Sequence, residues 1–316
     1  MKKTLCIILS LTLCVLSGCS LGNDTIRFGA AGIGGMYYTF SNNFTQIASK
    51  ENENLDFQVK ETAGSIANVR LLSGGYIEMG ISQMDLVNDA YYGTGDYTGG
   101  RKTGYSAVAA LYKEPCQIVV LDKSDIHSLD DLQGKTVSIG EEESGTELNA
   151  LEILKVAGLT ENLVKTENYD YTNAVKQLQA GNIDAMFLTA GVQTTIIEEL
   201  AKKSDIRLIS IDEKTAKKLK ASYKFYSDYT IPANTYTGQK EDISTLCVRS
   251  VLLASNNMSE DTVKELTSIL FKNADKLQYS LAINFDLTIE EATDGITIPF
   301  HSGAVAYYKE HGKNVE

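Results

Sequence analysis

Apolar and polar positions along the chain recur with two periods, one typical of strands and the other of helices. Residues 25–50 begin with a short apolar strand and a glycine-rich loop, and the apolar residues that follow lie on one face of a helix. Residues 55–59 alternate between apolar and polar side chains, as in a half-buried strand. Apolar runs at 107–112 and 117–122 predict two buried strands. Because strands and helices alternate as far as Ile211, the pattern favours an α/β fold.

The last third of the chain has a different pattern. A connector rich in aromatic residues spans 222–244, a strongly apolar strand spans 245–255, and an amphipathic helix is predicted over 259–279. Residues 71–80 and 177–186 echo each other, which favours two similarly built lobes. If the last third packs back on the first, the chain crosses between the lobes at least twice and leaves a cleft. Such clefts at the strand ends of α/β sheets are where ligands bind.

The first residues predict an export signal. A basic start precedes an apolar run that is too short for a stable membrane span. The run ends in Leu-Ser-Gly-Cys, which is typical of a bacterial lipoprotein that is cut before Cys19 and lipidated on its thiol; an ordinary signal peptide that contains a cysteine is the alternative. We expect a signal peptide at 1–18, a lipidated linker at 19–25, and an exported protein anchored to the cell membrane.

Composition narrows the classes of partner and of site. A hydrophobic content of 43% argues against global disorder, and a formal net charge of -12 argues against nucleic acid or an anionic membrane surface as a partner. Outside the signal peptide and Cys19, the remaining cysteines are Cys116 and Cys247, which are either two buried thiols or one disulfide. The three histidines, His127, His301 and His311, are scattered, so we expect no metal site.

No catalytic set can be assembled from the sequence. There is no Gly-x-Ser-x-Gly elbow, no Walker loop, and no histidine near a candidate nucleophile. The segment 29–38 suggests a dinucleotide fingerprint, but Tyr37 occupies the place of its last glycine. The acidic run 141–143 is interpreted as a solvated rim. We therefore expect neither catalysis nor a cofactor.

Four strand-to-helix junctions are rich in small polar residues. A helix N-terminus carries about half a positive charge and several unpaired N–H groups, which suits an anion. The hydroxyl-bearing segment 144–146 can be a simple helix cap, or a cap that also holds a ligand. If these helix starts converge, they supply hydrogen-bond donors without any Arg or Lys. The junctions lie near Gly35, Gly64, Asp85 and Gly145.

Six segments together resemble the TAXI-type solute receptors of TRAP transporters. They are FGAAGIGGMYY, ETAGSIANVRLLSGGYIEMGISQMDLVNDAYYG, GEEESGT, AGNIDAMFLTAGVQT, IPANTYTGQ and IPFHSGAVAYYKE. The resemblance covers nearly the whole mature chain in the expected order. It implies a type II periplasmic-binding-protein fold with a first lobe at 26–118, a second lobe at 119–246, and a return strand with C-terminal helices at 247–316. It further implies a monomer that delivers a small organic acid or amino acid, glutamate- or 2-oxoglutarate-like, to an ion-driven permease.

The resemblance also implies which residues bind the ligand. By position these are Gly35, Met36, Tyr37, Tyr38, Thr62, Ser65, Asn68, Gln83, Asp85, Ser144, Gly145, Thr146, Ala190, Gly191 and Gln193. The chain departs from the family at Ala30-Ala31, where relatives often have Thr or Gly, which puts hydroxyl contacts there in doubt. Asp85 would suit a ligand ammonium, or it serves as a helix cap.

Two other functions stay open at this point. One is a lipoprotein that senses a ligand and signals through a membrane partner. The other is an enzyme on the same two-lobed fold, as in the tetrapyrrole-forming deaminases. Such an enzyme needs an Arg-rich cleft and a cofactor bound to a cysteine, whereas Arg is sparse here and the chain carries an export signal.

Overall fold

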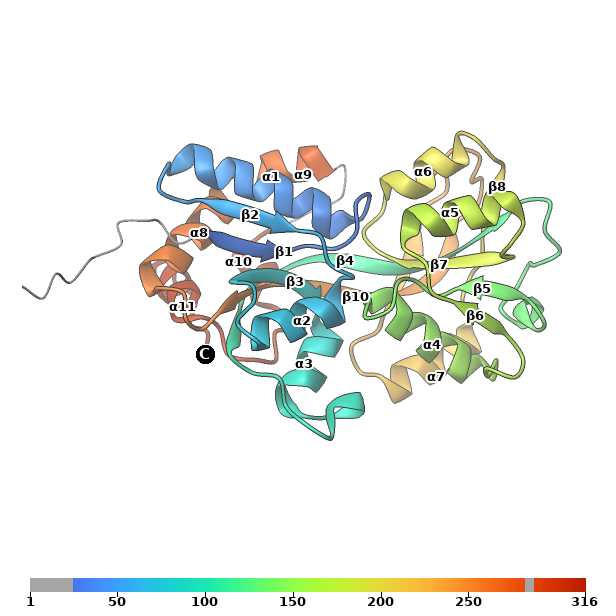
Figure 1. Cartoon of the computed structure of the whole chain (residues 1–316), viewed down its shortest axis with the longest axis horizontal. Helices are drawn as coiled ribbons and strands as arrows, with labels where there is room; N and C mark the ends of the chain where they lie inside the picture. Colours follow the sequence, from blue (N-terminus) through green and yellow to red (C-terminus); the bar gives the residue numbers. More distant parts are fainter. Residues whose placement is uncertain (1–24, 282–286) are drawn as a thin grey trace, which may run out of the picture.

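The computed structural model describes residues 25–281 and 287–316. The predicted signal peptide, the predicted lipidation site Cys19 and the linker up to residue 24 lie outside these residues. Figure 1 shows two lobes, each built from strands with helices packed on them, and two long strands that run from one lobe into the other. None of the helices in the described residues combines the length and apolar character that a membrane span needs.

The first lobe has helices on both faces of a parallel sheet (Figure 1). Its strands are β1 (Ile26–Gly29), β2 (Phe57–Lys60) and β3 (Met79–Gln83), and its helices are α1 (Met36–Glu51), α2 (Ser65–Ser73) and α3 (Met84–Tyr92). The C-terminal helices are α8 (Glu260–Lys272), α9 (Ala274–Leu281), α10 (Ile289–Thr293) and α11 (Ser302–Glu310). They pack on this lobe, where Leu266 and Leu270 of α8 join Phe40 and Phe44 of α1 in one core.

The second lobe repeats this arrangement. Its strands are β5 (Thr136–Ser138), β6 (Lys165–Glu167), β7 (Ala185–Thr189) and β8 (Ile206–Leu208), and its helices are α4 (Gly145–Ala157), α5 (Tyr171–Ala180), α6 (Thr195–Ala201) and α7 (Glu213–Ser222). Strand β5 lies between β6 and β7 and is parallel to both. Short 3-10 helices are η1 (Gly95–Tyr97) in the first lobe and η2 (Asp130–Leu132) in the second.

Strands β4 (Tyr105–Leu121) and β10 (Ile243–Ser255) cross between the lobes, antiparallel to each other. Strand β10 pairs with β3 in the first lobe and with β9 (Ser227–Ile231) in the second, while β4 pairs with β7 and β8. The resulting strand order is β2-β1-β3-β10-β4-β7-β5-β6. The prediction of an α/β fold with two lobes and two crossing strands is therefore confirmed.

The long strand β4 corrects one prediction. The apolar runs 107–112 and 117–122 were expected to be separate strands, but they are one strand of 17 residues. The backbone stays extended through Lys113, Glu114 and Pro115. Pro115 has no N–H to donate, and a strand tolerates proline only where its ladder can be interrupted. That position is the passage of β4 from one lobe to the other, where its partner strand changes.

The helix predicted over 259–279 is also different, because it is divided into α8 and α9 at Asn273. The Asn273 side chain donates a hydrogen bond of 2.9 Å to the carbonyl oxygen of Ile269 and one of 2.8 Å to Glu51 of α1. Side-chain bonds of this kind compete with the helical backbone pattern. They end α8 where it meets α1.

The two cysteines of the folded chain lie on the crossing strands, Cys116 on β4 and Cys247 on β10. Both are buried free thiols, which decides between the two alternatives left by the sequence. Burial raises the pKa of both thiols, so both are protonated at neutral pH.

Candidate functional site

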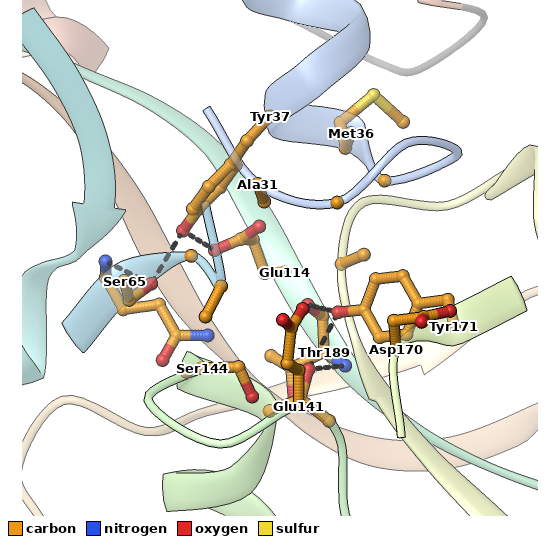
Figure 2. Close-up of a pocket in the computed structure, with 18 residues that line it drawn as sticks. Ala31, Met36, Tyr37, Ser65, Glu114, Glu141, Ser144, Asp170, Tyr171 and Thr189 are labelled. Carbon is orange, nitrogen blue, oxygen red and sulfur yellow. Dashed lines mark hydrogen bonds between the residues drawn. The ribbon is translucent and has the colours of Figure 1, made fainter. Parts of the chain in front are cut away.

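A cavity lies between the two lobes, against the crossing strand β4 (Figure 2). The first lobe and β4 contribute Ala31, Gly32, Gly35, Met36, Tyr37, Ala63, Gly64, Ser65, Gln83 and Glu114. The second lobe contributes Glu141, Ser144, Gly145, Thr146, Asp170, Tyr171, Thr189 and Ala190. The cavity volume is about 40 Å³. Since one water molecule needs about 10–15 Å³ on this measure, the space accepts only a small ligand.

Five helices of the described residues begin at this cavity. Helix α1 starts after Gly35, α2 after Gly64, α3 after Gln83, α4 after Ser144 and α5 after Asp170. The strands that precede them are parallel, so their carboxyl ends and the following helix starts meet at one edge of each sheet. Neither Gly35 nor Gly64 has a side chain that could cap its helix. The first amides of α1 and α2 are thus left to other acceptors.

The start of α4 combines a cap with free amides. The Ser144 hydroxyl accepts a hydrogen bond of 3.0 Å from the Glu147 amide, which is an N-cap. The Thr146 hydroxyl lies 2.7 Å from the Tyr171 hydroxyl and accepts a bond of 3.1 Å from the Thr189 amide. In the described part of the chain, the backbone N–H groups of Gly145 and Thr146 have no acceptor. The donors offered to a ligand are therefore these amides rather than the two hydroxyls.

Gly145 lies where the lobes meet, and any side chain there would force a neighbour to shift. A Cβ atom at this position would lie 2.4 Å from Oε1 of Gln83, a residue of the first lobe, and within 2.7 Å of the other atoms of that amide. Real Cβ atoms do not approach other atoms so closely. Gly64 is needed for another reason, because its φ of +119° is favourable only for glycine. The two glycines let the start of α2 and the start of α4 approach each other across the cleft.

A buried carboxyl group of β4, that of Glu114, lies in the cavity wall (Figure 2). Its exposed fraction is 1%, and it accepts a hydrogen bond of 2.7 Å from the Tyr37 hydroxyl. The Tyr37 hydroxyl is also 3.3 Å from the hydroxyl of Ser65. The Ser65 hydroxyl in turn accepts a hydrogen bond from the backbone N–H of Gln83. Burial raises the pKa of Glu114 to about 8, and the charge of Asp85 adds to this shift, while the hydrogen bond from Tyr37 opposes it.

Sequence reasoning missed Glu114, Asp170, Tyr171 and Thr189. For Glu114 a signal was present, since it is the one acid within the mostly apolar run 105–121. An ionisable side chain at a buried strand position costs free energy unless it has a partner or a role. Asp170 and Tyr171 follow β6 and begin α5, a further strand-to-helix junction that the pattern of small polar residues did not mark.

The acidic loop 141–143 corrects the interpretation of a solvated rim in part. Glu141 lines the cavity, and burial, followed by the charges of Asp170 and Glu61, raises its pKa. Glu142 is exposed, as expected of a rim residue. Glu143 joins the two lobes instead.

Glu143 contacts the first lobe through its side chain and its backbone. The Arg70 guanidinium donates two hydrogen bonds to the Glu143 carboxylate, of 2.8 Å and 2.6 Å. The Ala67 amide donates a bond of 3.2 Å to the Glu143 carbonyl oxygen. Glu143 has a φ of 65°, in the left-handed region that few residues other than glycine adopt. These bonds join α2 to the loop before α4 across the cleft.

Nine of the fifteen predicted binding residues line the cavity. They are Gly35, Met36, Tyr37, Ser65, Gln83, Ser144, Gly145, Thr146 and Ala190. Two others have their polar groups used inside the first lobe. The Asn68 side chain donates to the carbonyl oxygens of Gly29, Ala30 and Ile81, which ties the ends of β1 and β3 together. The Thr62 hydroxyl donates to the Ala30 carbonyl oxygen at 2.7 Å.

The other four predicted residues also lie outside the lining of this cavity. The Gly191 carbonyl accepts a bond from the Thr194 hydroxyl, and the Gln193 side chain donates to the Thr235 carbonyl. Tyr38 is half-buried on α1. Asp85 faces a different groove, where Asn149 approaches it at 3.4 Å, and burial raises its pKa to about 6. It lies in the first turn of α3, where a negative charge interacts favourably with the helix N-terminus, and α3 has no side-chain capping hydrogen bond.

The described residues include few groups that could bind a metal ion or act in catalysis. They contain no cluster of three or more His, Cys, Asp or Glu that could hold a metal ion. The lining residues include no Cys, Lys or His, and the Ser144 hydroxyl serves as a helix cap. What the cavity supplies is a set of backbone donors, hydroxyl groups and carboxyl groups that can hold a small polar molecule.

The chain is similar in sequence to one protein family and in structure to several solved proteins. Residues 28–312 match the model of the NMT1-like family. PhnD1 from Prochlorococcus marinus (MIT 9301), solved in complex with methylphosphonate, is similar at 15% identity and a TM-score of 0.55, over 82% of this chain and 88% of that chain. A putative L-cystine ABC transporter from Listeria monocytogenes is similar at 15% identity and a TM-score of 0.52, over 81% of this chain and 93% of that chain.

The alkanesulfonate-binding protein SsuA from Xanthomonas axonopodis pv. citri, bound to MOPS, is similar at 15% identity and a TM-score of 0.50, over 82% of this chain and 78% of that chain. Likeness at this level of identity concerns the fold. Together with the strand order and the two crossing strands, it confirms the type II periplasmic-binding-protein fold expected from the sequence.

Proposed function

The chain belongs to the NMT1-like family, and from this premise we propose that it is an extracytoplasmic substrate-binding protein without catalytic activity. It captures a small organic acid or amino acid and delivers it to a TRAP-type membrane permease. One observation carries the proposal: unpartnered backbone amides at helix starts from both lobes face one small cavity between the lobes. Such amides bind a carboxylate without a basic side chain.

The TRAP assignment rests on the TAXI-type segments and on where they lie. The segments FGAAGIGGMYY, ETAGSIANVR and GEEESGT each contribute residues to the cavity wall, although they are far apart in the sequence. A shared ligand site gives these separated segments a common role. The lobe assignment, 26–118 and 119–246 with a return at 247–316, belongs to the same proposal, as does a monomeric state.

Membrane attachment is the part of the proposal that rests on the sequence alone. The lipoprotein box ends at Cys19, outside the described residues. Replacing Cys19 by Ser is expected to release soluble protein or to leave an uncleaved precursor. Unchanged membrane partition and electrophoretic mobility of the Cys19→Ser variant would contradict lipid anchoring.

Ligand binding is tested by native mass spectrometry of protein purified without added ligand, followed by thermal unfolding with glutamate, glutamine, 2-oxoglutarate and succinate. A ligand at about a hundred times its Kd stabilises the folded state by about 2.7 kcal/mol. For a chain of this size, each kcal/mol raises Tm by about 2–4 °C. A protein that carries no bound molecule and shows no shift at millimolar concentrations would contradict the proposal. Loss of uptake on deletion would tie the binding protein to a permease.

A further inference from the structure

The side chains around the cavity carry charge of one sign. Its lining includes the carboxyl groups of Glu114, Glu141 and Asp170, and it includes no Lys, Arg or His. The free amides of Gly145 and Thr146 lie at the start of α4, in the second lobe. A ligand with one carboxylate finds donors at these amides. The rest of that ligand then faces carboxyl groups rather than a compensating cation.

Glu114 is the most deeply buried of the three acids, with an exposed fraction of 1%. Figure 2 shows its carboxyl group in the cavity wall with the hydrogen bond that it accepts from Tyr37. The Gln83 side chain is a second hydrogen-bonding neighbour that favours the ionised form of Glu114. Neutral donors of this kind do not fully compensate a buried negative charge. In a closed cleft without a basic side chain, the group that can do so is a cation on the ligand.

A second buried acceptor in the same wall lacks a donor. Gln83 lines the cavity with an exposed fraction of 1%, and its Oε1 atom has no hydrogen-bond partner in the described residues. Buried side-chain oxygens are nearly always hydrogen-bonded, so an unpaired one calls for a donor. An ammonium group brings three N–H donors, whereas a second carboxylate brings none.

We propose that the cavity selects a zwitterion, an α-amino acid, with its ammonium group at Glu114 and its carboxylate at the start of α4. This inference rests on the proposed function, because it names the class of ligand that the binding protein takes. It excludes dicarboxylates without an amino group, such as succinate and 2-oxoglutarate, as the preferred ligands. Gln83 completes the ammonium site, and Asp170 and Glu141 add negative charge around it.

A dicarboxylate could use the same cavity only if Glu114 were protonated and donated a hydrogen bond to it. The two ligand classes are therefore expected to change the protonation of Glu114 in opposite directions. Binding of an amino acid favours the ionised carboxylate, so Glu114 releases a proton and the affinity rises with pH. Binding of a dicarboxylate favours the protonated carboxyl group, so Glu114 takes up a proton. The titratable groups that face Glu114 are Tyr37 of α1, Tyr112 of β4, Asp85 of α3 and Tyr171 of α5. The tyrosines stay protonated below pH 9, since burial raises the pKa of each.

Matched pairs of ligands test the inference on the wild-type protein. Isothermal titration calorimetry at several pH values between neutral and pH 8.5 compares glutamate with glutarate, alanine with propionate, and glutamine with its deaminated analogue. We expect the amino member of at least one pair to bind more tightly than its partner by about 10- to 100-fold. Its affinity is expected to rise with pH. Equal affinity within every pair that binds, or tightest binding by 2-oxoglutarate or succinate, would overturn the inference and leave the proposed function standing.

The identity of a co-purified molecule provides a second readout. A bound molecule in native mass spectra that contains a primary amine supports the inference, and one without an amine overturns it. No bound molecule together with no binding by any member of the panel would contradict the proposed function itself, and the inference with it.

The substitution Glu114→Gln removes the negative charge of this side chain and nearly keeps its shape. The amide oxygen keeps an acceptor for Tyr37, so we expect the variant to fold, which circular dichroism of the ligand-free protein checks. Affinity for the amino ligand is expected to fall by about 10- to 100-fold, with no loss for the deaminated partner. Glu142→Gln, an exposed position on the acidic loop, is the matched control and is expected to bind like wild type. Equal losses for both members of a pair would assign Glu114 a structural role. If Glu114→Gln does not fold, the ligand pairs on wild type decide.

Discussion

Two hollows among the described residues contain an acid with a raised pKa, and they differ in the features expected of a ligand site. The first is the cavity at Glu114. The second, here called the acidic groove, has a volume of about 550 Å³ and is lined by side chains that include Asp85, Asp89, Asp96, Glu152, Tyr97, Tyr223 and Phe225. Burial raises the pKa of Glu114 and of Glu152 to about 8 in each case. A raised pKa therefore does not distinguish the two.

The difference lies in the donors around each acid. Glu152 lies within α4, away from its N-terminus, and the Tyr226 hydroxyl donates to it at 2.6 Å, while Tyr226 also accepts a bond of 2.9 Å from Asn149. The acidic groove does receive the start of α3, but Asp85 occupies its first turn and supplies negative charge there. At the cavity, helices begin after Gly35 and Gly64, which have no side chain to offer. A helix N-terminus is available to a ligand only where the chain itself leaves it open.

The largest effect is expected from Gly145→Val. Its side chain would enter the space held by the Gln83 amide, where even a Cβ atom would be 2.4 Å from Oε1. The lobes could then close only with a shift of backbone or of Gln83, and ligand affinity is expected to fall on the order of 100-fold. Calorimetry checks the affinity and small-angle scattering checks closure. Gly99→Val, at an exposed glycine with no atom nearby, is the control. Wild-type affinity of Gly145→Val would show that the lobes do not meet at this point.

The buried Glu114 and the half-buried Glu152 are expected to make stability depend on pH in the same direction. The ordinary pKa of each carboxyl is 4.5 and its folded value is about 8, so the folded state binds more protons between these values. The free energy of unfolding is therefore highest below about pH 4.5 as far as these groups are concerned, and falls as pH rises toward 8, by at most about 1.4 kcal/mol per pH unit for Glu114.

Adding a ligand distinguishes the contribution of Glu114 to this pH dependence from that of Glu152. Glu114→Gln and Glu152→Gln are each expected to flatten the decline of Tm with pH in the ligand-free protein. A saturating amino acid ligand is expected to flatten the part that Glu114 contributes, because an ammonium favours its ionised form, and to leave the part from Glu152 unchanged. Thermal unfolding from pH 5 to pH 8 measures both. A ligand effect that persists in full in Glu114→Gln would place the binding event elsewhere.

A moderate effect is expected from Thr146→Ala. The hydroxyl that it removes accepts a bond from the Thr189 amide and contacts the Tyr171 hydroxyl. Loss of this acceptor leaves a buried N–H unpaired, which costs about 1–3 kcal/mol of stability. Ligand affinity is expected to fall by about 0.5–1.5 kcal/mol or less, because the Thr146 amide remains. The Tm of the ligand-free variant and its affinity are measured together. A large loss of affinity with an unchanged Tm would mean that the hydroxyl itself contacts the ligand.

The smallest effect is expected from Arg70→Ala, which removes the side-chain bond between the lobes. The pair with Glu143 is partly exposed, with side-chain exposed fractions of 51% and 39%, so its contribution is about 0–1 kcal/mol. The change is expected to weaken ligand binding slightly, because only the closed state contains the pair. Lys217→Ala breaks an exposed pair within α7 and serves as the control. A loss tenfold or greater would make this pair a principal determinant of closure.

Much of the fold could be predicted because its signals are local. Helix starts at Gly35, Gly64 and Gly145 follow from glycine and hydroxyl residues at strand ends, and apolar periodicity separates strands from helices. Where a prediction failed, a distant contact decided the outcome. Asn273 ends α8 with the help of Glu51, which is more than two hundred residues earlier in the chain. No window of sequence contains both residues.

The candidate site shows the same division. The sequence by itself determined the residue types at the helix starts and the TAXI-type segments in their order. It did not determine that Tyr37, Glu114 and Ser65 meet, because they belong to three elements up to 77 residues apart. Only the tertiary structure decided that Asn68 is used to hold β1 and β3, and that Glu114 is enclosed without a cation nearby. The physical reason is that burial and charge depend on all neighbours in space, whereas capping and periodicity depend on neighbours in the chain.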